Sequence, residues 1–413
     1  MQLTDYEQSL LNGDYCGEAR QLMTIMLKVA EINQATELVN VKHVMIGNTG
    51  MLSVAGKTGI NFLTRLAESG IKFKVPTFTN VVSMEVEQWR QMGIPEEYAK
   101  KQLMGIEAWR RMGAILCLSC MPHLCGAIPM YGDYVAYSDT APVIFANSYF
   151  GARSNRESDL VALAAAICGR VPCFGYHLDE NRVGQVMINV KVVLKEDSDY
   201  DALGYYVGRI VQDRVPVFKN IGEFISLQSF IQLGAALATA GSVALFHCIG
   251  ITPEVKQHPY LYGKKNVIEQ IEVNDENIKA TYRELNNTDV TKLDLVFIGC
   301  PHCTLDKLKY IARVLDGQRI NRGSELWISA SSVVRGLVSR SGDTQIIERS
   351  GAKVLADTCA VVAPTSMLGY HNVATDSAKA QIYLSDFGLN VRFGTTDQCL
   401  AAAVRGYWED KRA

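Results

Sequence analysis

Three cysteines stand at positions where their side chains can share one site. They are Cys120, Cys300 and Cys359, which follow expected strands at 114–118, 293–298 and 354–355. Open α/β sheets gather their sites at the carboxyl ends of parallel strands. Three thiolates from three loops can hold an iron–sulfur cluster and leave one iron open as a Lewis acid. The spacing therefore indicates a metal centre, with three unrelated buried cysteines as the alternative.

The other cysteines limit that interpretation. The chain has 11 cysteines, an odd number, and opens without the pattern of a signal peptide. We therefore expect a cytoplasmic, reduced protein whose cysteines are core residues, ligands or nucleophiles. Cys117 with Cys120, and Cys300 with Cys303, have the spacing of zinc half-sites. The two pairs are too far apart in the sequence for a compact zinc module.

The densest group of polar side chains is a second candidate site. It contains Asn147, Ser148, Arg153, Asn155 and Arg156, directly before an expected helix at 160–168. Two guanidinium groups and several amides at a helix N-terminus form a carboxylate or phosphate site. The alternative is a capped helix with solvated arginines. His177 follows, as a possible acid, base or hydrogen-bond donor, or as a structural histidine.

Composition and patterning exclude several classes of protein. The formal net charge of −2 argues against a nucleic-acid binder. Residues 224–253 carry no charged side chain, but their polar residues and glycines favour a buried helix to about 240 and a strand at 243–248 over a membrane span. Gly56-Lys57-Thr58 suggests a P-loop, yet five residues separate Gly50 from Gly56 where the motif has four. An ordinary strand–turn–helix junction is favoured.

Helical and strand patterns alternate along the chain, which predicts the α/β class with parallel sheets. The main expected helices are 18–33, 58–69, 84–92, 95–112, 160–168, 304–315 and 377–384, and the main further strands are 39–46, 73–75, 186–194, 326–330 and 391–393. The charged stretch 273–289 is expected to separate an N-terminal α/β region, 1–285, from a C-terminal one, 286–413. The C-terminal region carries two of the three cysteines.

Motifs distributed over nearly the whole chain resemble those of the aconitase X family. They are Phe145-Ala146-Asn147-Ser148, Gly151-Ala152-Arg153-Ser154-Asn155-Arg156-Glu157, Gly175 to Arg182, Ala244-Leu245-Phe246-His247 with Thr252-Pro253-Glu254, Gly299-Cys300-Pro301-His302, and Asp357-Thr358-Cys359 with Ala363-Pro364. The resemblance implies an aconitase-like fold, with several parallel-sheet α/β domains around a central cleft and no swivelling fourth domain. It also implies the large subunit of a hydro-lyase whose small subunit supplies that domain and a catalytic serine.

The resemblance also implies roles for particular residues. Cysteines matching Cys120, Cys300 and Cys359 would hold an iron–sulfur cluster, or a mononuclear iron. Three neighbours, Cys117, Cys125 and Cys303, stay open as substitute ligands. Lys379 is a further candidate for substrate binding. This chain has Asp376-Ser377-Ala378-Lys379 where relatives often read Asn-Ser-x-Lys, and Cys120-Met121-Pro122-His123 where they often read Cys-Thr-Pro-Tyr.

The expected reaction is the dehydration of a small 3-hydroxy acid. A base must take the α-proton, and the hydroxyl must leave with help. Arg153 and Arg156 would hold the carboxylate while Asn147 and Asn155 orient it. The Cys-, Met- and Gln-rich composition suggests a mesophilic bacterium and favours cis-3-hydroxy-L-proline, converted to Δ1-pyrroline-2-carboxylate, as the substrate. Mevalonate 5-phosphate is the alternative substrate, and a non-catalytic iron-binding or sensing protein is a third possibility.

Overall fold

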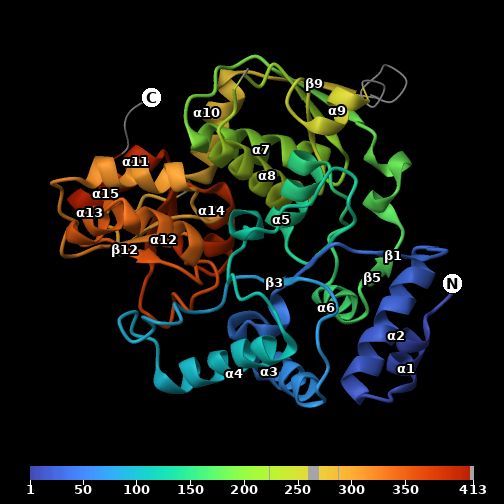
Figure 1. The fold of residues 1–413 in the computed structure, drawn as a ribbon. Coiled ribbons are helices and arrows are strands. Elements are labelled where there is room, and N and C mark those ends of the chain that lie inside the picture. The colour runs from blue at the N-terminus through green and yellow to red at the C-terminus, as the bar shows by residue number, and fades with distance from the viewer. Residues whose placement is uncertain (223, 259–268, 287, 410–413) are drawn as a thin grey trace.

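The computed structural model describes residues 1–222, 224–258, 269–286 and 288–409, and its core consists of three parallel sheets. In Figure 1 the elements around the first sheet are mainly blue to cyan, those of the second green to yellow, and those of the third orange to red. The expected α/β class with several parallel sheets is confirmed. Within the described residues no helix is long and apolar enough to cross a membrane.

The first sheet is formed by β2 (Val44–Ile46), with β3 (Thr77–Thr79) and β4 (Ala136–Tyr137) parallel to it on either side. The surrounding helices are α1 (Asp5–Asn12), α2 (Gly17–Ile32), α3 (Leu52–Glu68), α4 (Glu96–Met112) and α6 (Asp159–Cys168). A two-stranded antiparallel ribbon, β1 (Leu38–Asn40) with β5 (Arg170–Pro172), lies beside α2 and α6.

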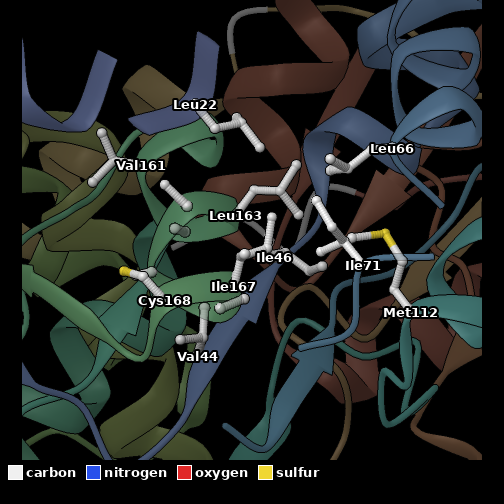
Figure 2. Packing of buried hydrophobic residues seen from close by; sticks show 14 of the residues in the cluster. Leu22, Val44, Ile46, Leu66, Ile71, Met112, Val161, Leu163, Ile167 and Cys168 are labelled. Carbon is white, nitrogen blue, oxygen red and sulfur yellow. The ribbon is translucent and has the colours of Figure 1, made fainter. Parts of the chain in front are cut away.

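The core of this region contains apolar residues from α2, β2, α3 and α6. Figure 2 shows Leu22 of α2, Ile46 of β2 and Leu163 of α6 directed toward one another. Each is at most 1 % exposed. The sulfur of Cys168 lies in the same cluster, as expected of a cysteine that fills a core. Burial on both faces explains why β2 reads as a continuous apolar run.

The second sheet has the order β8–β7–β6–β9, all parallel. Its strands are β6 (Val186–Val190), β7 (Pro216–Lys219), β8 (His247–Cys248) and β9 (Glu269–Val273), and its helices are α7 (Asp197–Val211), α8 (Leu227–Gly241), α9 (Pro253–Gln257) and α10 (Asp275–Leu285). The short α5 (Thr140–Phe145) packs against α8. The apolar stretch around 230 is therefore a buried helix, as expected.

The third sheet has the order β12–β11–β10–β13–β14, again all parallel. Its strands are β10 (Leu295–Ile298), β11 (Glu325–Ser329), β12 (Lys353–Leu355), β13 (Asn372–Thr375) and β14 (Asn390–Phe393). Its helices are α11 (Leu305–Leu315), α12 (Ser332–Arg340), α13 (Asp343–Arg349), α14 (Ala378–Asp386) and α15 (Thr396–Arg405). The chain builds outward from β10 and then returns beside it with β13, so the order reverses between these two strands. Open α/β sheets bind ligands at such a switch point.

Several expected elements are wrong. Residues 84–92 form turns rather than a helix, because Met84, Trp89 and Met92 are buried in a cluster shared with the third sheet. Residues 73–75 form no strand, and the chain bends at residues 74 and 75. The strand expected at 114–118 is reduced to one bridge between Ile115 and Phe78.

Three further boundaries also differ. The strand expected at 243–248 pairs only at His247–Cys248. The strand expected at 39–46 is divided into β1 and β2, and the one expected at 186–194 ends at Val190. Gly56 has a non-helical backbone inside α3, so the Gly-Lys-Thr segment lies at a break within a helix.

The close approach of α7 and α8 generates a stability prediction. A Cβ on Gly204 would lie 2.6 Å from the Leu233 carbonyl oxygen, whereas a Cβ on the exposed Gly336 of α12 meets nothing within 4 Å. We expect Gly204→Ala to lower the free energy of unfolding by about 1–3 kcal/mol through overpacking. Alanine has the higher helix propensity at both positions. Because the added methyl group meets no other atom at position 336, Gly336→Ala should raise the free energy of unfolding by about 0.5–1 kcal/mol. Urea unfolding measures the free energy of unfolding of both variants. Equal changes in the two variants would contradict the prediction.

Candidate active site

Cys120, Cys300 and Cys359 lie at strand ends of two different sheets. Cys300 follows β10 and Cys359 follows β12 in the third sheet. Cys120 belongs to a loop that runs past β3 of the first sheet, where the Ser119 N–H donates to the Thr79 carbonyl oxygen over 3.2 Å. All three side chains are buried, at 5–8 % exposure. The three predicted thiols therefore lie in loops at the carboxyl ends of strands from two sheets, and these ends face each other.

The three thiols influence one another electrostatically. Burial, followed by the neighbouring Cys359, raises the pKa of Cys120 to about 12. Burial and Cys359 also raise the pKa of Cys300 well above its usual range. Burial raises the pKa of Cys359, against hydrogen bonds from the backbone of Val362 and Val361. These raised pKa values keep the thiols protonated at neutral pH even though the nearby Lys379 acts to lower them.

Lys379 supplies a positive charge next to the thiols. It lies on the first turn of α14, beyond β13, and its Nζ donates to Thr140 Oγ1 over 3.0 Å. Burial acts to lower its pKa, but Asp139 and the thiols of Cys300 and Cys120 more than offset this, so the pKa is raised. The Nζ also lies 4.0 Å from Asp139 Oδ1. The predicted Lys379 is thus a buried ammonium at the switch point of the third sheet.

The neighbouring cysteines pack elsewhere. Cys117 and Cys125 lie together with Phe78 and Ala127, and Cys303 is fully buried in the core of the third sheet. The two zinc half-sites are therefore not assembled. Within the described ranges, no three His, Cys, Asp or Glu side chains are close enough together to bind a single metal ion.

The Asn-rich segment of the second candidate site forms internal hydrogen bonds. Asn147 is fully buried, and its amide donates to the Ser154 and Ala244 carbonyl oxygens, both over 2.8 Å. Ser148 Oγ accepts from the Phe246 N–H over 2.9 Å. The Asn155 amide donates to the Phe174 carbonyl oxygen over 3.0 Å. In this structure these side chains join chain segments, and their predicted contact with substrate stays a prediction.

The two predicted arginines lie in different surroundings. Arg153 is bridged to Tyr134 and Arg156 to Tyr137, three positions further along, which corresponds to about 10 Å of extended chain. The Arg153 guanidinium donates to the His177 carbonyl oxygen over 2.7 Å and pairs with Asp179. Arg156 is exposed, and within the described residues its guanidinium makes no hydrogen bond or ion pair. Of these two arginines, Arg156 is the one whose donors are all unused within the described residues.

His177 is buried at 1 % exposure, and its Nδ1 lies 3.0 Å from the Pro172 carbonyl oxygen. Burial lowers its pKa to about 4, so the imidazole is neutral at pH 7. Its Nε2 is buried without a hydrogen-bond partner in the described residues. The acid–base role of His177 therefore stays a prediction. In that role the imidazole ring would begin in its neutral form.

Two buried ion pairs were not expected from the sequence. Arg182 forms two bonds to Glu254, 2.7 and 2.8 Å long, and both residues are buried. Asp376, which stands where relatives often have an amide, lies 3.0 Å from the buried Lys307 Nζ. Both members of the first pair belong to motifs already noted, but sequence spacing alone does not show that they meet.

Comparison with known proteins agrees with this geometry. Residues 1–180, 184–283 and 293–405 match the first, second and third domains described for aconitase X. The crystal structure of Thermococcus kodakaraensis aconitase X in its holo-form superimposes with a TM-score of 0.88 at 34 % identity, covering 98 % of this chain and 100 % of that one.

Two groups of curated proteins are similar in sequence. The phosphomevalonate dehydratase large subunit of Methanocaldococcus jannaschii is 38 % identical over 97 % of this chain and 99 % of its own length. The cis-3-hydroxy-L-proline dehydratase of Pseudomonas aeruginosa is 30 % identical over 98 % of this chain and 70 % of its own length. The chain therefore belongs to the aconitase X family and is a dehydratase, that is, a hydro-lyase.

Proposed function

We propose that the chain dehydrates mevalonate 5-phosphate as the large subunit of a two-subunit enzyme. The observation that carries the proposal is the order of identities. Large subunits of phosphomevalonate dehydratase from M. jannaschii, Methanothermobacter thermautotrophicus and T. kodakarensis are 38, 37 and 35 % identical to the chain. The cis-3-hydroxy-L-proline dehydratases of P. aeruginosa and Hypocrea jecorina are 30 and 28 % identical.

The substrate expected first from composition fits these relatives less well. Cysteine and methionine content responds to growth conditions and says nothing about the shape of a pocket, so it was a weak guide. The third expectation, a non-catalytic iron-binding or sensing protein, does not fit a family of dehydratases. The relatives named as large subunits imply a small-subunit partner. That this partner carries a swivelling domain and a catalytic serine, and that the complex is cytoplasmic, belongs to the proposal.

An iron–sulfur cluster held by Cys120, Cys300 and Cys359 is the second part of the proposal. The donor set is that of such clusters, three buried thiols with backbone N–H groups directed at two of the sulfurs. A mononuclear iron is disfavoured, because the described residues do not gather three such ligands around one point. A polynuclear cluster separates its thiolates more widely. When bound, its open iron would polarise the departing hydroxyl oxygen.

Cationic side chains then hold the substrate. Lys379 lies beside the thiols, where an ammonium can offset both thiolate charge and a substrate carboxylate. Arg156 is the guanidinium with unused donors, and a planar guanidinium binds a carboxylate or phosphate through two parallel bonds. Arg153 fixes the segment through His177 and Asp179, with Asn147, Ser148 and Asn155 holding the same segment from within. Arg156 is therefore the arginine we assign to the anion.

The substrate assignment is tested by product analysis. The full chain is produced anaerobically with its small subunit and offered mevalonate 5-phosphate or cis-3-hydroxy-L-proline at equal concentration. We expect kcat/KM for mevalonate 5-phosphate to be higher by roughly a hundredfold or more, because charged subsites left empty cost several kcal/mol. Preferential turnover of cis-3-hydroxy-L-proline would reverse the assignment.

The cluster assignment is tested by single cysteine substitutions. Cys120→Ser, Cys300→Ser and Cys359→Ser should each abolish the visible absorption of the iron centre and lower the bound iron, because serine is a poor ligand for this metal. Cys168→Ser and Cys248→Ser are matched controls, since both thiols are buried in apolar clusters. Iron and acid-labile sulfide per chain are measured anaerobically. Full iron content in the variant that lacks all three cysteines would exclude the site.

The anion site is tested at Arg156. Arg156→Lys should lose about 1.5–3 kcal/mol of transition-state stabilisation, seen as a ten- to hundredfold lower kcat/KM, because lysine cannot make the paired bonds. Iron content should not change. Arg322→Lys, at another exposed arginine, is the control for a general surface effect. Arg153→Lys should mainly lower the melting temperature. Normal kinetics of Arg156→Lys would show that the anion binds elsewhere.

A further inference from the structure

His302 lies where the three cysteine loops meet, and the proposed reaction gives it no role. It stands two positions after Cys300, in the turn before α11. Its side chain is completely buried. A buried imidazole has two ring nitrogens that need partners, so its contacts define which segments it joins.

The contacts of His302 reach both of the other two cysteine loops. Its Nδ1 lies 3.1 Å from Ser119 Oγ, next to Cys120. Its Nε2 lies 3.2 Å from the carbonyl oxygen of Thr358, next to Cys359. Its own backbone N–H donates to the Cys120 sulfur over 3.4 Å. One residue therefore contacts the loops of Cys120 and Cys359 and is itself part of the loop of Cys300.

The directions of these bonds agree with one protonation state. A carbonyl oxygen only accepts, so Nε2 carries the proton and donates to Thr358. Ser119 Oγ accepts from the Met121 N–H over 3.1 Å, which leaves its hydroxyl proton free to donate to Nδ1. Both ring nitrogens are therefore satisfied in the neutral ring, and Ser119, His302 and Thr358 are all fully buried.

We propose that His302 is a positioning residue that holds the three cysteine loops at the spacing of one metal centre. The loops come from two separate sheets, so no strand pairing between sheets fixes Cys120 against Cys300 and Cys359. A rigid ring that bonds at both ends sets this separation, whereas a flexible side chain would not. The metal-binding part of this proposal rests on the proposed function. The part that says His302 holds the three loops in place does not depend on it.

Three substitutions separate the two ring contacts. The amide of His302→Asn can replace Nδ1 and keep the Ser119 contact, while that of His302→Gln can replace Nε2 and keep the Thr358 contact. His302→Ala removes both. The matched control is His247→Gln, because His247 is also fully buried and has one ring bond, of 2.8 Å, to the Arg182 carbonyl oxygen. Its strand lies in the second sheet, which contributes none of the three cysteines.

The first measurement is the rate at which the anaerobically prepared two-subunit enzyme loses iron to a ferrous chelator. We expect release to be roughly tenfold faster in His302→Asn and His302→Gln and faster still in His302→Ala, the scale known for residues that orient metal ligands. His247→Gln should release iron at close to the wild-type rate. Unchanged release in His302→Ala, or equal acceleration in His247→Gln, would overturn the proposal.

The second measurement needs no metal. Thiol labelling of the iron-free complex, followed by mass spectrometry of each cysteine, should be several-fold faster at Cys120 and Cys359 in His302→Ala than in the wild type, and unchanged at Cys168. If the wild-type chain binds no iron, the proposed metal centre fails, but the labelling result still tests His302. Labelling at Cys120 and Cys359 that is no faster in His302→Ala would show that His302 does not hold the loops.

Discussion

Three buried thiols on neighbouring loops are the constraint on which the rest of the site depends. Burial raises the pKa of each thiol, and Cys359 further raises the pKa of Cys120 and of Cys300, so the site needs positive charge and hydrogen-bond donors before thiolates can form. Lys379 and backbone N–H groups provide part of that compensation. A bound metal would provide the remainder, which couples metal binding to proton release.

The same constraint explains how the polar motifs are used. Asn147, Ser148 and Asn155 form hydrogen bonds to backbone groups of the protein, and Arg182 is neutralised by Glu254. Breaking one partner of a buried pair is costly, so this network fixes the position of the second sheet relative to the first. Motif residues that resemble a ligand site in the sequence thus connect parts of the chain, whereas the Arg156 side chain is exposed.

The sequence predicts those elements whose structure follows from the local pattern of apolar residues. Parallel strands buried on both faces, such as β10, read as continuous apolar runs, and the cysteines after them were found by that rule. Prediction from the local pattern failed where contacts between distant segments determine the structure. Residues 84–92 have helical spacing but pack their apolar side chains against the third sheet, and only one bridge remains of the strand before Cys120. Contacts between distant segments, such as His302 with Ser119, leave no periodic signal.

The strand order of the third sheet finally explains why the site stands where it does. Because the order reverses between β10 and β13, the loops after these strands diverge and leave room between them. Cys300 follows one strand, and Asp376 to Lys379 follow the other. The Asp376 carboxylate lies 3.0 Å from Lys307 Nζ, and the same ammonium lies 2.8 Å from Asp197. Asp139 and the thiols of Cys300 and Cys120 raise the pKa of Lys379 against the effect of burial, so its positive charge stays beside the thiols although residue 376 is a carboxylate.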